Sequence, residues 1–369
     1  MHPMQNMFAK YADLLVNYSL ALQKGERVFI SSTYLAEPLL MEVHAAVLHA
    51  GAHPFFDLAM RGQEKSFFVH AQDHHLDFVS PFKKMAFEEF EAFLSIKAPY
   101  SLEEDSGIDP EKRKRFKKTM SAVTETYMQR TGSGKMKRCL CQFPTEADAK
   151  IAGMSLEEYT AFVFSACFLN AENPVDEWLK IRRMQQSIVD FLNTKKQMRY
   201  RHPDFDISFS CEGRTWINSD GRANMPSGEV FTSPVEDSVN GTIHFSFPGL
   251  QFGKEVEGVS LHVKDGEIIS WSAEKGQDVL DEVFKLPGAT RFGEAAIGTN
   301  SNIQRITRNI LFDEKIGGSV HMAVGQSYYH CGGKNQSDIH WDMITDMKNG
   351  GEIFADGELI YKNGKFLIS

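Results

Sequence analysis

The sequence has no excess of positive charge, which disfavours a nucleic-acid or membrane-surface partner. Lysine and arginine total 40 while aspartate and glutamate total 49, so the formal net charge is −9. Phosphate backbones and anionic lipid surfaces attract basic proteins. The one basic run, "DPEKRKRFKK" at 109–118, contains acidic residues as well and indicates a solvated helix face. We therefore expect neither kind of partner.

Long apolar runs and secretion features are lacking too. No stretch reaches the roughly 18 apolar residues of a membrane span. The start of the chain has no basic region followed by an apolar core and a small-residue cleavage site. The five cysteines are odd in number and include no Cys-x-x-Cys pair, so we expect reduced structural thiols instead of a disulfide framework or a zinc knuckle. These absences predict a cytoplasmic protein without membrane spans.

What is present is typical of a soluble globular chain with two domains. The 369 residues are 42% hydrophobic and 24% charged, and one hydrophobic core seldom serves a chain of this length. "GERVFIS" and "EPLLMEVHAAVLHAGAHPFFDL" predict strand, helix and strand, the order of a parallel sheet covered by helices. Residues 80–130 favour amphipathic helices, and a capping box predicts a helix start at Ser155. We expect an α/β N-terminal domain over residues 1–185.

The second half has a different texture. After about residue 197, short β-branched and aromatic runs are separated by glycine, and the turn pairs Asp265-Gly266, Asp356-Gly357 and Asn363-Gly364 occupy hairpin positions. A long helix predicted over 175–196 would connect the two domains. We expect residues 186–369 to form an α+β, largely antiparallel catalytic domain.

Two motifs of the first half invite functional readings that their context opposes. "TGSGKMK" lacks the first glycine and the hydroxyl residue of a phosphate-binding loop, so it favours a flexible loop. "QDHHLDF" contains Asp73, His74, His75 and Asp77 and resembles the Asp-His-His signature of some phosphoesterases. The flanking sequence is helical and solvated, whereas those enzymes place their aspartates at the ends of apolar strands.

Metal-ligand chemistry is concentrated in the C-terminal half. Four separated segments place carboxylates, histidines or a tyrosine next to glycine, where backbone can approach an ion closely. The residues are Glu229, Glu294, His321 with Tyr328, and His340 with Asp342. On a strand, His340 and Asp342 share one face while Trp341 points into the opposite layer. The spacing therefore permits both residues to bind one ion.

The charge of this set favours a pair of metal ions. Three carboxylates and one bridging hydroxide balance two divalent cations, and neutral histidines can complete the coordination shells. Isolated acids and histidines in glycine-rich loops are, however, commonly turn residues or helix caps. From the residues alone, both readings stay open.

Taken together, the segments resemble the thermophilic-type metalloaminopeptidases, the group of aminopeptidase T, aminopeptidase S and PepS. "GRTWINSDGRANMPSGEVFTSPVEDSVNGTI", "LFDEKIGGSVHMAVG" and "NQSDIHWDMITDM" carry most of the resemblance, which covers nearly the whole chain. It implies an α/β domain followed by a catalytic domain, a homodimer, and removal of N-terminal amino acids from peptides. Two divalent ions, zinc, cobalt or manganese, are implied as cofactors.

The resemblance also implies roles for single residues. Glu229 is similar to the carboxylate ligand of the Met-Pro-x-Gly-Glu segment, and Glu294 matches the bridging carboxylate. The remaining matching ligands are His321, His340 and Asp342. Tyr328 corresponds to a tyrosine beside the metals that assists catalysis. Ser319 departs from the threonine common in the family, and the segment before His340 is short.

The resulting hypothesis is a two-metal aminopeptidase in which a hydroxide shared by the ions attacks the scissile carbonyl. Tyr328 donates a hydrogen bond to the developing oxyanion. Glu314, in "FDEKIGG", is a candidate for proton transfer, although a helix-capping or ion-pairing role fits the same position. A dimetal phosphoesterase is an alternative, because similar ligand sets serve phosphate esters. A catalytically silent binding protein with the same fold is a second alternative.

Overall fold

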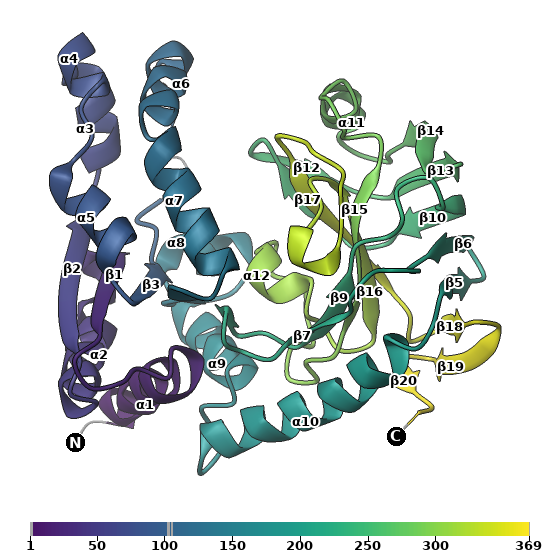
Figure 1. The fold of residues 1–369 in the computed structure, drawn as a ribbon, viewed down its shortest axis with the longest axis horizontal. Coiled ribbons are helices and arrows are strands. Elements are labelled where there is room, and N and C mark those ends of the chain that lie inside the picture. Colours follow the sequence, from purple (N-terminus) through teal and green to yellow (C-terminus); the bar gives the residue numbers. More distant parts are fainter. Residues whose placement is uncertain (1–2, 102–103, 105, 369) are drawn as a thin grey trace. The chain divides into compact units, whose positions relative to one another are not determined.

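The computed structural model describes residues 3–101, 104 and 106–368, and the chain divides into two compact units (Figure 1). The first unit comprises residues 1–175 and 221–226, and the second comprises residues 176–220 and 227–369. The expected boundary between residues 185 and 186 falls inside a helix of the second unit and stays a prediction. Over the described ranges, no helix combines the length and apolarity needed to cross a bilayer.

The first unit is built on a parallel sheet with the strand order β2-β1-β3-β4-β8. The strands are β1 (Arg27–Thr33), β2 (His53–Ala59), β3 (Ala92–Lys97), β4 (Lys137–Gln142) and β8 (Asn224–Met225). The predicted order of strand, helix and strand is confirmed by β1, α2 and β2, so the α/β class of this half is confirmed as well.

Helices and helical turns connect these strands. They are α1 (Pro3–Asp13), the π-helical turn η1 (Leu14–Ser19), the 3-10 turn η2 (Tyr34–Ala36), α2 (Glu37–His49), α3 (Gln63–His70), α4 (Asp73–Leu76), α5 (Pro81–Glu89), α6 (Pro110–Thr119), α7 (Ser121–Gly132), α8 (Glu146–Ile151) and α9 (Leu156–Ala166). The capping box predicted at Ser155 is confirmed: its hydroxyl accepts from the Glu158 backbone N–H, and the Glu158 carboxylate accepts from the Ser155 N–H.

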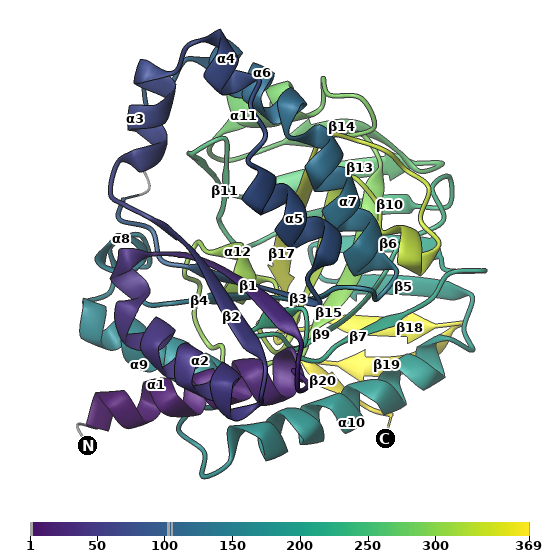
Figure 2. The ribbon, with the colours of Figure 1, turned by 60° about the vertical axis from the view of Figure 1, so that its left-hand side comes forward.

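Aromatic packing fixes α5 and α7 on one face of this sheet. Phe29 of β1 lies in one buried cluster with Phe87 of α5 and Val123 of α7. The chain moves one way from β1 to β2 and the opposite way from β2 to β3, so right-handed crossovers place α2 and α5 on opposite faces. Figure 2 is consistent with this, with α2 and α5 on different sides of the strands.

Two strands of this sheet, β3 and β8, were not predicted from the sequence. The region over about 80–130 is rich in helix, as expected, but it also contains Ala92–Lys97, which forms β3 in the middle of the sheet and was not predicted. Its residues alternate between buried and partly buried over only six positions. So short an alternation is hard to recognise between helical segments. β8 has only two residues. It belongs to a short segment, residues 221–226, that returns to the first unit after the chain has passed through residues 176–220 of the second unit.

The second unit is antiparallel, as expected for this half. One sheet has the order β14-β13-β10-β6-β5-β18-β19-β20, another has the order β17-β16-β15-β9-β7, and β11 pairs with β12. The strands are β5 (Gln197–His202), β6 (Phe205–Ser210), β7 (Ile217–Ser219), β9 (Glu229–Thr232), β10 (Asn240–Phe245), β11 (Gly249–Gln251), β12 (Lys254–Val256), β13 (Val259–Lys264), β14 (Glu267–Ser272), β15 (Phe292–Gly298), β16 (Ser319–Gly325), β17 (His340–Asp346), β18 (Glu352–Ala355), β19 (Glu358–Lys362) and β20 (Lys365–Phe366).

One long helix, several short ones and tight turns complete the second unit. The helices are α10 (Pro174–Leu192), which begins at the end of the first unit, α11 (Gln277–Val283), α12 (Ile310–Asp313) and the 3-10 turn η3 (Tyr329–Cys331). The three predicted hairpin turns are confirmed, because Asp265-Gly266, Asp356-Gly357 and Asn363-Gly364 have positive φ at both residues and join consecutive strands.

Candidate metal centre

Four neighbouring strands of one sheet carry the five ligands expected from the sequence. Glu229 starts β9, Glu294 lies on β15, His321 lies on β16, and His340 and Asp342 lie on β17. In the ladders, Glu294 pairs with Ala323, Ala323 pairs with Asp342, and Ala296 pairs with His321. Residues directly opposite one another share a face of the sheet. All five side chains therefore project from the same face.

The opposite face of these strands is the hydrophobic core. Its buried side chains are Val230, Ala295, Ile297, Val320, Met322, Val324, Trp341 and Met343. Because side chains alternate along a strand, burial of this set fixes the register that turns the polar set outward. The predicted alternation at "HWD" is confirmed: Trp341 is 5% exposed in the core while His340 and Asp342 face each other across 3.5 Å.

The polar side chains converge closely enough to surround metal ions. One group of ligand atoms comes from Glu229, Glu294 and His321, and a second group comes from Glu294, His340 and Asp342, with the atoms of each group within 4.8 Å of one another. Glu294 belongs to both groups. His321 Nε2 lies 3.7 Å from Glu294 Oε1, and His340 Nε2 lies 3.0 Å from Glu294 Oε2, so each carboxylate oxygen faces a different imidazole.

Backbone contacts orient the second group. His340 Nδ1 lies 2.7 Å from the carbonyl oxygen of Gln326 and donates to it. This contact selects the tautomer in which Nε2 carries the free lone pair, and Nε2 points toward Glu294 and Asp342. Metal-binding histidines are held in this way by a carbonyl behind the ring.

Buried polar atoms without hydrogen-bond partners fit a cation. Within the described part of the chain, Glu229 Oε2, His321 Nε2 and Asp342 Oδ1 make no hydrogen bond. Glu229 Oε2 and His321 Nε2 lie 3.3 Å apart, within ion-pair distance but without hydrogen-bond geometry. Buried polar atoms without partners are costly, and an ion coordinated by oxygen and imidazole nitrogen would satisfy all three. The donor set therefore suits a divalent metal.

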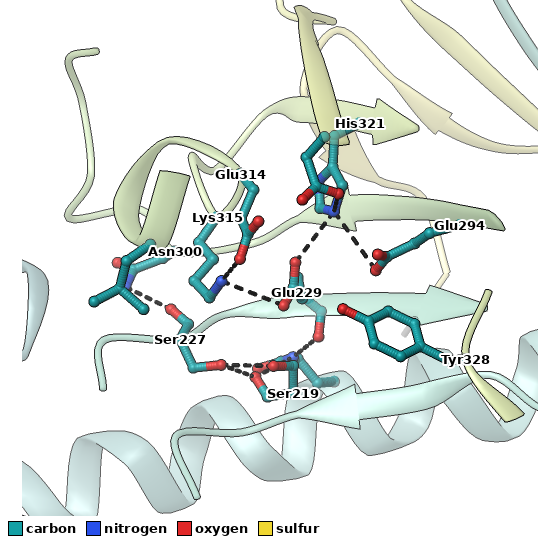
Figure 3. A network of polar contacts seen from close by, with 12 residues as sticks. Ser219, Ser227, Glu229, Glu294, Asn300, Glu314, Lys315, His321 and Tyr328 are labelled. Atoms are coloured by element: carbon teal, nitrogen blue, oxygen red, sulfur yellow. Dashed lines mark hydrogen bonds and ion pairs between the residues drawn. The ribbon is translucent and has the colours of Figure 1, made fainter. Parts of the chain in front are cut away.

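The segment before Glu229 holds this ligand in place (Figure 3). Gly228 has φ +116°, and a Cβ there would lie 2.7 Å from the Asn300 Cβ, so glycine is required. Asn300 donates from Nδ2 to the Ser227 carbonyl at 2.9 Å, and the Ser227 hydroxyl donates to the Ser219 carbonyl at 2.8 Å. The backbone that precedes Glu229 is thus tied to two other segments.

Lys315 is a buried residue of the centre that was not predicted from the sequence. Lys315 is fully buried and its ammonium forms an ion pair with Glu314, while its Nζ also lies 3.4 Å from Glu229 Oε1 (Figure 3). Glu314, expected as a proton-transfer residue, reaches a third group of ligand atoms with His321 and Asp342. The signal was available, since Lys315 follows Glu314 directly, but adjacent charges usually mark a solvated surface.

Tyr328 lies beside the second group. Its hydroxyl is 3.4 Å from His340 Nε2, and its ring contacts the rings of Phe231 and His340 at centroid distances of 5.3 and 5.0 Å. The charge of Glu294, followed by burial, holds the pKa of Tyr328 well above its usual value. The tyrosine is therefore a protonated hydrogen-bond donor near neutral pH.

The concentration of acids sets the electrostatics of the centre. Burial lowers the pKa of His321, but contact with Glu294 and the charges of Glu229 and Asp342 outweigh it and raise this pKa to about 9. Burial raises the pKa of Glu314 to about 8, in spite of the opposing charge of Lys315; divalent ions held by the neighbouring ligands would lower this pKa and favour the ionised carboxylate. The pocket of acids thus favours positive charge, whether protons or metal ions.

The histidine cluster of the first unit has an ordinary structural role. Arg115 forms ion pairs with Asp73 at 2.9 Å and with Asp77 at 2.6 Å, and His75 Nδ1 accepts a hydrogen bond from the Gln72 N–H at the start of α4. The side chains therefore cap and join helices. The "TGSGKMK" segment is a loop only in its middle: Thr131 and Gly132 end α7, residues 133–136 form the turn, and Lys137 begins β4.

Comparison with known proteins identifies the family. The sequence model of the thermophilic metalloproteases (M29) matches residues 4–366. Aminopeptidase 2 of Geobacillus stearothermophilus is 28% identical over 348 residues, which cover 86% of this chain and 83% of that protein.

Two solved structures share the fold. AmpT from Thermus thermophilus superposes with a TM-score of 0.85 at 22% identity, covering 99% of this chain and 100% of that one. A 2,5-dihydroxypyridine dioxygenase from Pseudomonas putida KT2440 gives a TM-score of 0.62 at 12% identity, with 98% and 97% covered. Since this fold also occurs in a dioxygenase, the fold alone does not distinguish a peptidase from a dioxygenase. The match of the family model to residues 4–366 does. The chain belongs to the thermophilic metalloprotease (M29) family and is a metal-dependent aminopeptidase.

Proposed function

We propose that Glu229, Glu294, His321, His340 and Asp342 hold two divalent ions, zinc, cobalt or manganese. The observation that carries this proposal is the position of Glu294, whose two oxygens face different imidazoles and belong to two separate ligand groups. A carboxylate placed in this way can bridge two ions. The other four residues then divide between the groups, Glu229 and His321 on one side and His340 and Asp342 on the other.

Ions bound there would act as Lewis acids toward a carbonyl oxygen and would lower the pKa of a water molecule toward neutrality. The protein supplies the geometry. Four strands joined by ladders of hydrogen bonds fix the ligands, and a site built on such elements is more rigid than one built on loops.

Tyr328 and Glu314 are the residues we propose to act on the substrate and its protons. The Tyr328 hydroxyl donates toward the oxyanion that forms when the scissile carbonyl is attacked, since it lies at the edge of the second ligand group. Glu314 lies within reach of His321 and Asp342 without belonging to the five ligands. From there its carboxylate accepts the proton of the attacking water and returns it to the leaving amine.

The substrates we propose are peptides with a free N-terminus. A free α-amine would offer its lone pair to a metal ion held by the five ligands, or a hydrogen bond to one of their carboxylates, whereas the amide nitrogen of an acylated N-terminus has no basic lone pair to offer. The name of the related aminopeptidase 2 supports exopeptidase action. The phosphoesterase alternative is not favoured, because the matching family model is that of metalloproteases and the related protein is named an aminopeptidase.

The first test is an assay of the intact protein with leucyl-p-nitroanilide, its N-acetyl analogue and p-nitrophenyl phosphate, before and after chelation. We expect release of nitroaniline from the free amine substrate alone, loss of it after chelation, and recovery with Zn²⁺, Co²⁺ or Mn²⁺. Two ions per chain by elemental analysis are expected at full activity. Turnover of the phosphate ester, or turnover unaffected by chelation, would reject the proposal.

The second test addresses Glu294 directly. Glu294→Gln keeps the volume and removes the bridging charge, so we expect loss of one or both ions and a fall in kcat of about 10²-fold or more, in the upper range for groups that fix a metal. Glu282→Gln, an exposed acid of α11 paired with Lys285, is the matched control. A Glu294→Gln protein that keeps two ions and full activity would remove Glu294 from the bridging position.

We also propose a cytoplasmic homodimer, with the α/β domain over 1–185 and the metal-binding domain over 186–369. The support is the resemblance to the aminopeptidase T group together with the free cysteines, which are all buried. Light scattering coupled to size exclusion measures the mass of the assembly, and a monomer at micromolar concentration would contradict the dimer.

A further inference from the structure

Lys315 places a positive charge inside the metal centre. Its side chain has no exposed surface, and its Nζ contacts two carboxylates, Glu314 in an ion pair and Glu229 at 3.4 Å. An ammonium ion is removed from water only at a considerable cost unless it is paired. A lysine at this position, beside residues that must attract cations, therefore calls for a reason.

The reason lies in the overlap between the ligand groups. His321 forms a close group with Glu229 and Glu294, but it also forms one with Glu314 and Asp342. A metal ion could therefore take Glu314 as a ligand and draw His321 and Asp342 with it. In that arrangement Glu314 would be coordinated and its carboxylate would no longer be available to move a proton.

The charge count points the same way. Four carboxylates, Glu229, Glu294, Glu314 and Asp342, lie in the overlapping groups. With neutral imidazoles, the ammonium of Lys315 brings their total to three negative charges. Two divalent ions and one hydroxide carry three positive charges and so balance it, whereas four uncompensated carboxylates leave the centre too anionic.

We propose that Lys315 is a positioning residue that reserves Glu314 for proton transfer by holding its carboxylate in an ion pair, away from the metal ions. The contact with Glu229 adds a second effect, because a positive charge at 3.4 Å from a ligand weakens that ligand's hold on a cation. This inference rests on the function proposed above and adds a means by which the chain limits its own metal affinity to keep a catalytic group free.

The test replaces Lys315 by methionine, which has a similar length and no charge. Chelator-stripped protein is titrated with Zn²⁺ against a competing chelator, and kcat and KM are measured on leucyl-p-nitroanilide. We expect Zn²⁺ to bind about tenfold tighter or more, since loss of a positive charge 3.4 Å from a ligand strengthens the attraction of the centre for a cation. We expect kcat to fall on the order of 100-fold with little change in KM. A purely structural lysine would weaken binding and turnover together.

The double variant Glu314→Gln with Lys315→Met is the matched control. It removes both charges of the pair, so the carboxylate that would capture an ion is absent. We expect its Zn²⁺ affinity to return to within about threefold of the natural protein while kcat stays low, because charge-neutral replacement of a pair leaves the remaining field nearly unchanged. An affinity that remains raised in the double variant would overturn the role of Glu314.

Glu314→Gln alone covers the case in which Lys315→Met does not fold. Of the two carboxylates that contact the Lys315 ammonium, only Glu229 then remains charged. The ammonium competes with the ion for Glu229, so we expect Zn²⁺ to bind about tenfold more weakly. Unchanged or tighter binding by this variant, or weaker binding by Lys315→Met, overturns the proposal. Failure of the proposed function is seen separately, because the natural protein would then bind fewer than two ions or lack aminopeptidase activity.

Discussion

Tyr328→Phe should separate catalysis from stability. The hydroxyl's contact with His340 Nε2 is 3.4 Å long, beyond the usual range for a hydrogen bond, so its loss should cost the folded state less than about 1 kcal/mol. The ring contacts with Phe231 and His340, at 5.3 and 5.0 Å, are kept by phenylalanine. In the transition state, by contrast, one donor to an oxyanion contributes about 2.7–4 kcal/mol, or 10²–10³ in kcat.

The assay compares kcat, KM and urea unfolding of Tyr328→Phe with those of the natural protein at full metal occupancy. Tyr329→Phe is the control, since this neighbouring tyrosine is exposed and its hydroxyl accepts from Gln336 Nε2. We expect a fall in kcat for Tyr328→Phe alone, with KM within about threefold, because the interaction forms only as charge develops. A kcat within about threefold of the natural value would refute oxyanion stabilisation by Tyr328.

Three further outcomes follow from the structure. Burial raises the pKa of Asp148 to about 6 from an ordinary 3.8, so its stabilising contribution is complete below about pH 4 and is lost as pH rises through about 6. Asp148→Asn should therefore stabilise the fold by up to about 3 kcal/mol at pH 8 and lose that advantage toward pH 4, as measured by urea unfolding; a constant difference would contradict this origin. Gly228→Ala should weaken Zn²⁺ binding at least about tenfold, because its Cβ would meet Asn300. Gly357→Ala, at φ +82° with open space around it, should strain the backbone and leave Zn²⁺ affinity unchanged; equal effects of both variants would remove the contact as the cause. Chelation should lower the unfolding temperature, since metal at 1,000 times its Kd stabilises the folded state by about 4 kcal/mol. Scanning fluorimetry with and without Zn²⁺ measures this shift, and an unchanged unfolding temperature would contradict the prediction.

The sequence could predict those features of the centre that depend on the alternation of polar and apolar residues along one strand. At "HWD", one apolar residue between two polar ones is enough to place His340 and Asp342 on the same face. The alternation cannot say which strands lie side by side, since pairing of β9, β15, β16 and β17 depends on contacts between distant segments. Lys315 was missed for the same reason. Its burial depends on the fold around it, and a lysine next to a glutamate has no local feature that distinguishes a buried pair from a solvated one.

The fold shows the same division between local and distant information. The hairpin turns at Asp265-Gly266 and Asn363-Gly364 were predictable because positive φ is a property of those residues. β8 was not, because two residues contain no periodicity. It pairs with β4 only after the chain has left the first unit and returned.

The arrangement of ligands on four strands of one sheet has a consequence for maturation. Because the side chains come from segments far apart in the sequence, an unfolded chain offers an ion no more than one or two of them at a time. High-affinity metal binding therefore requires that the strands have already paired, so metal ions are bound late in the folding of the chain. Once captured, the ions tie adjacent strands together across their side chains, so metal supply in the growth medium should influence how much active protein accumulates.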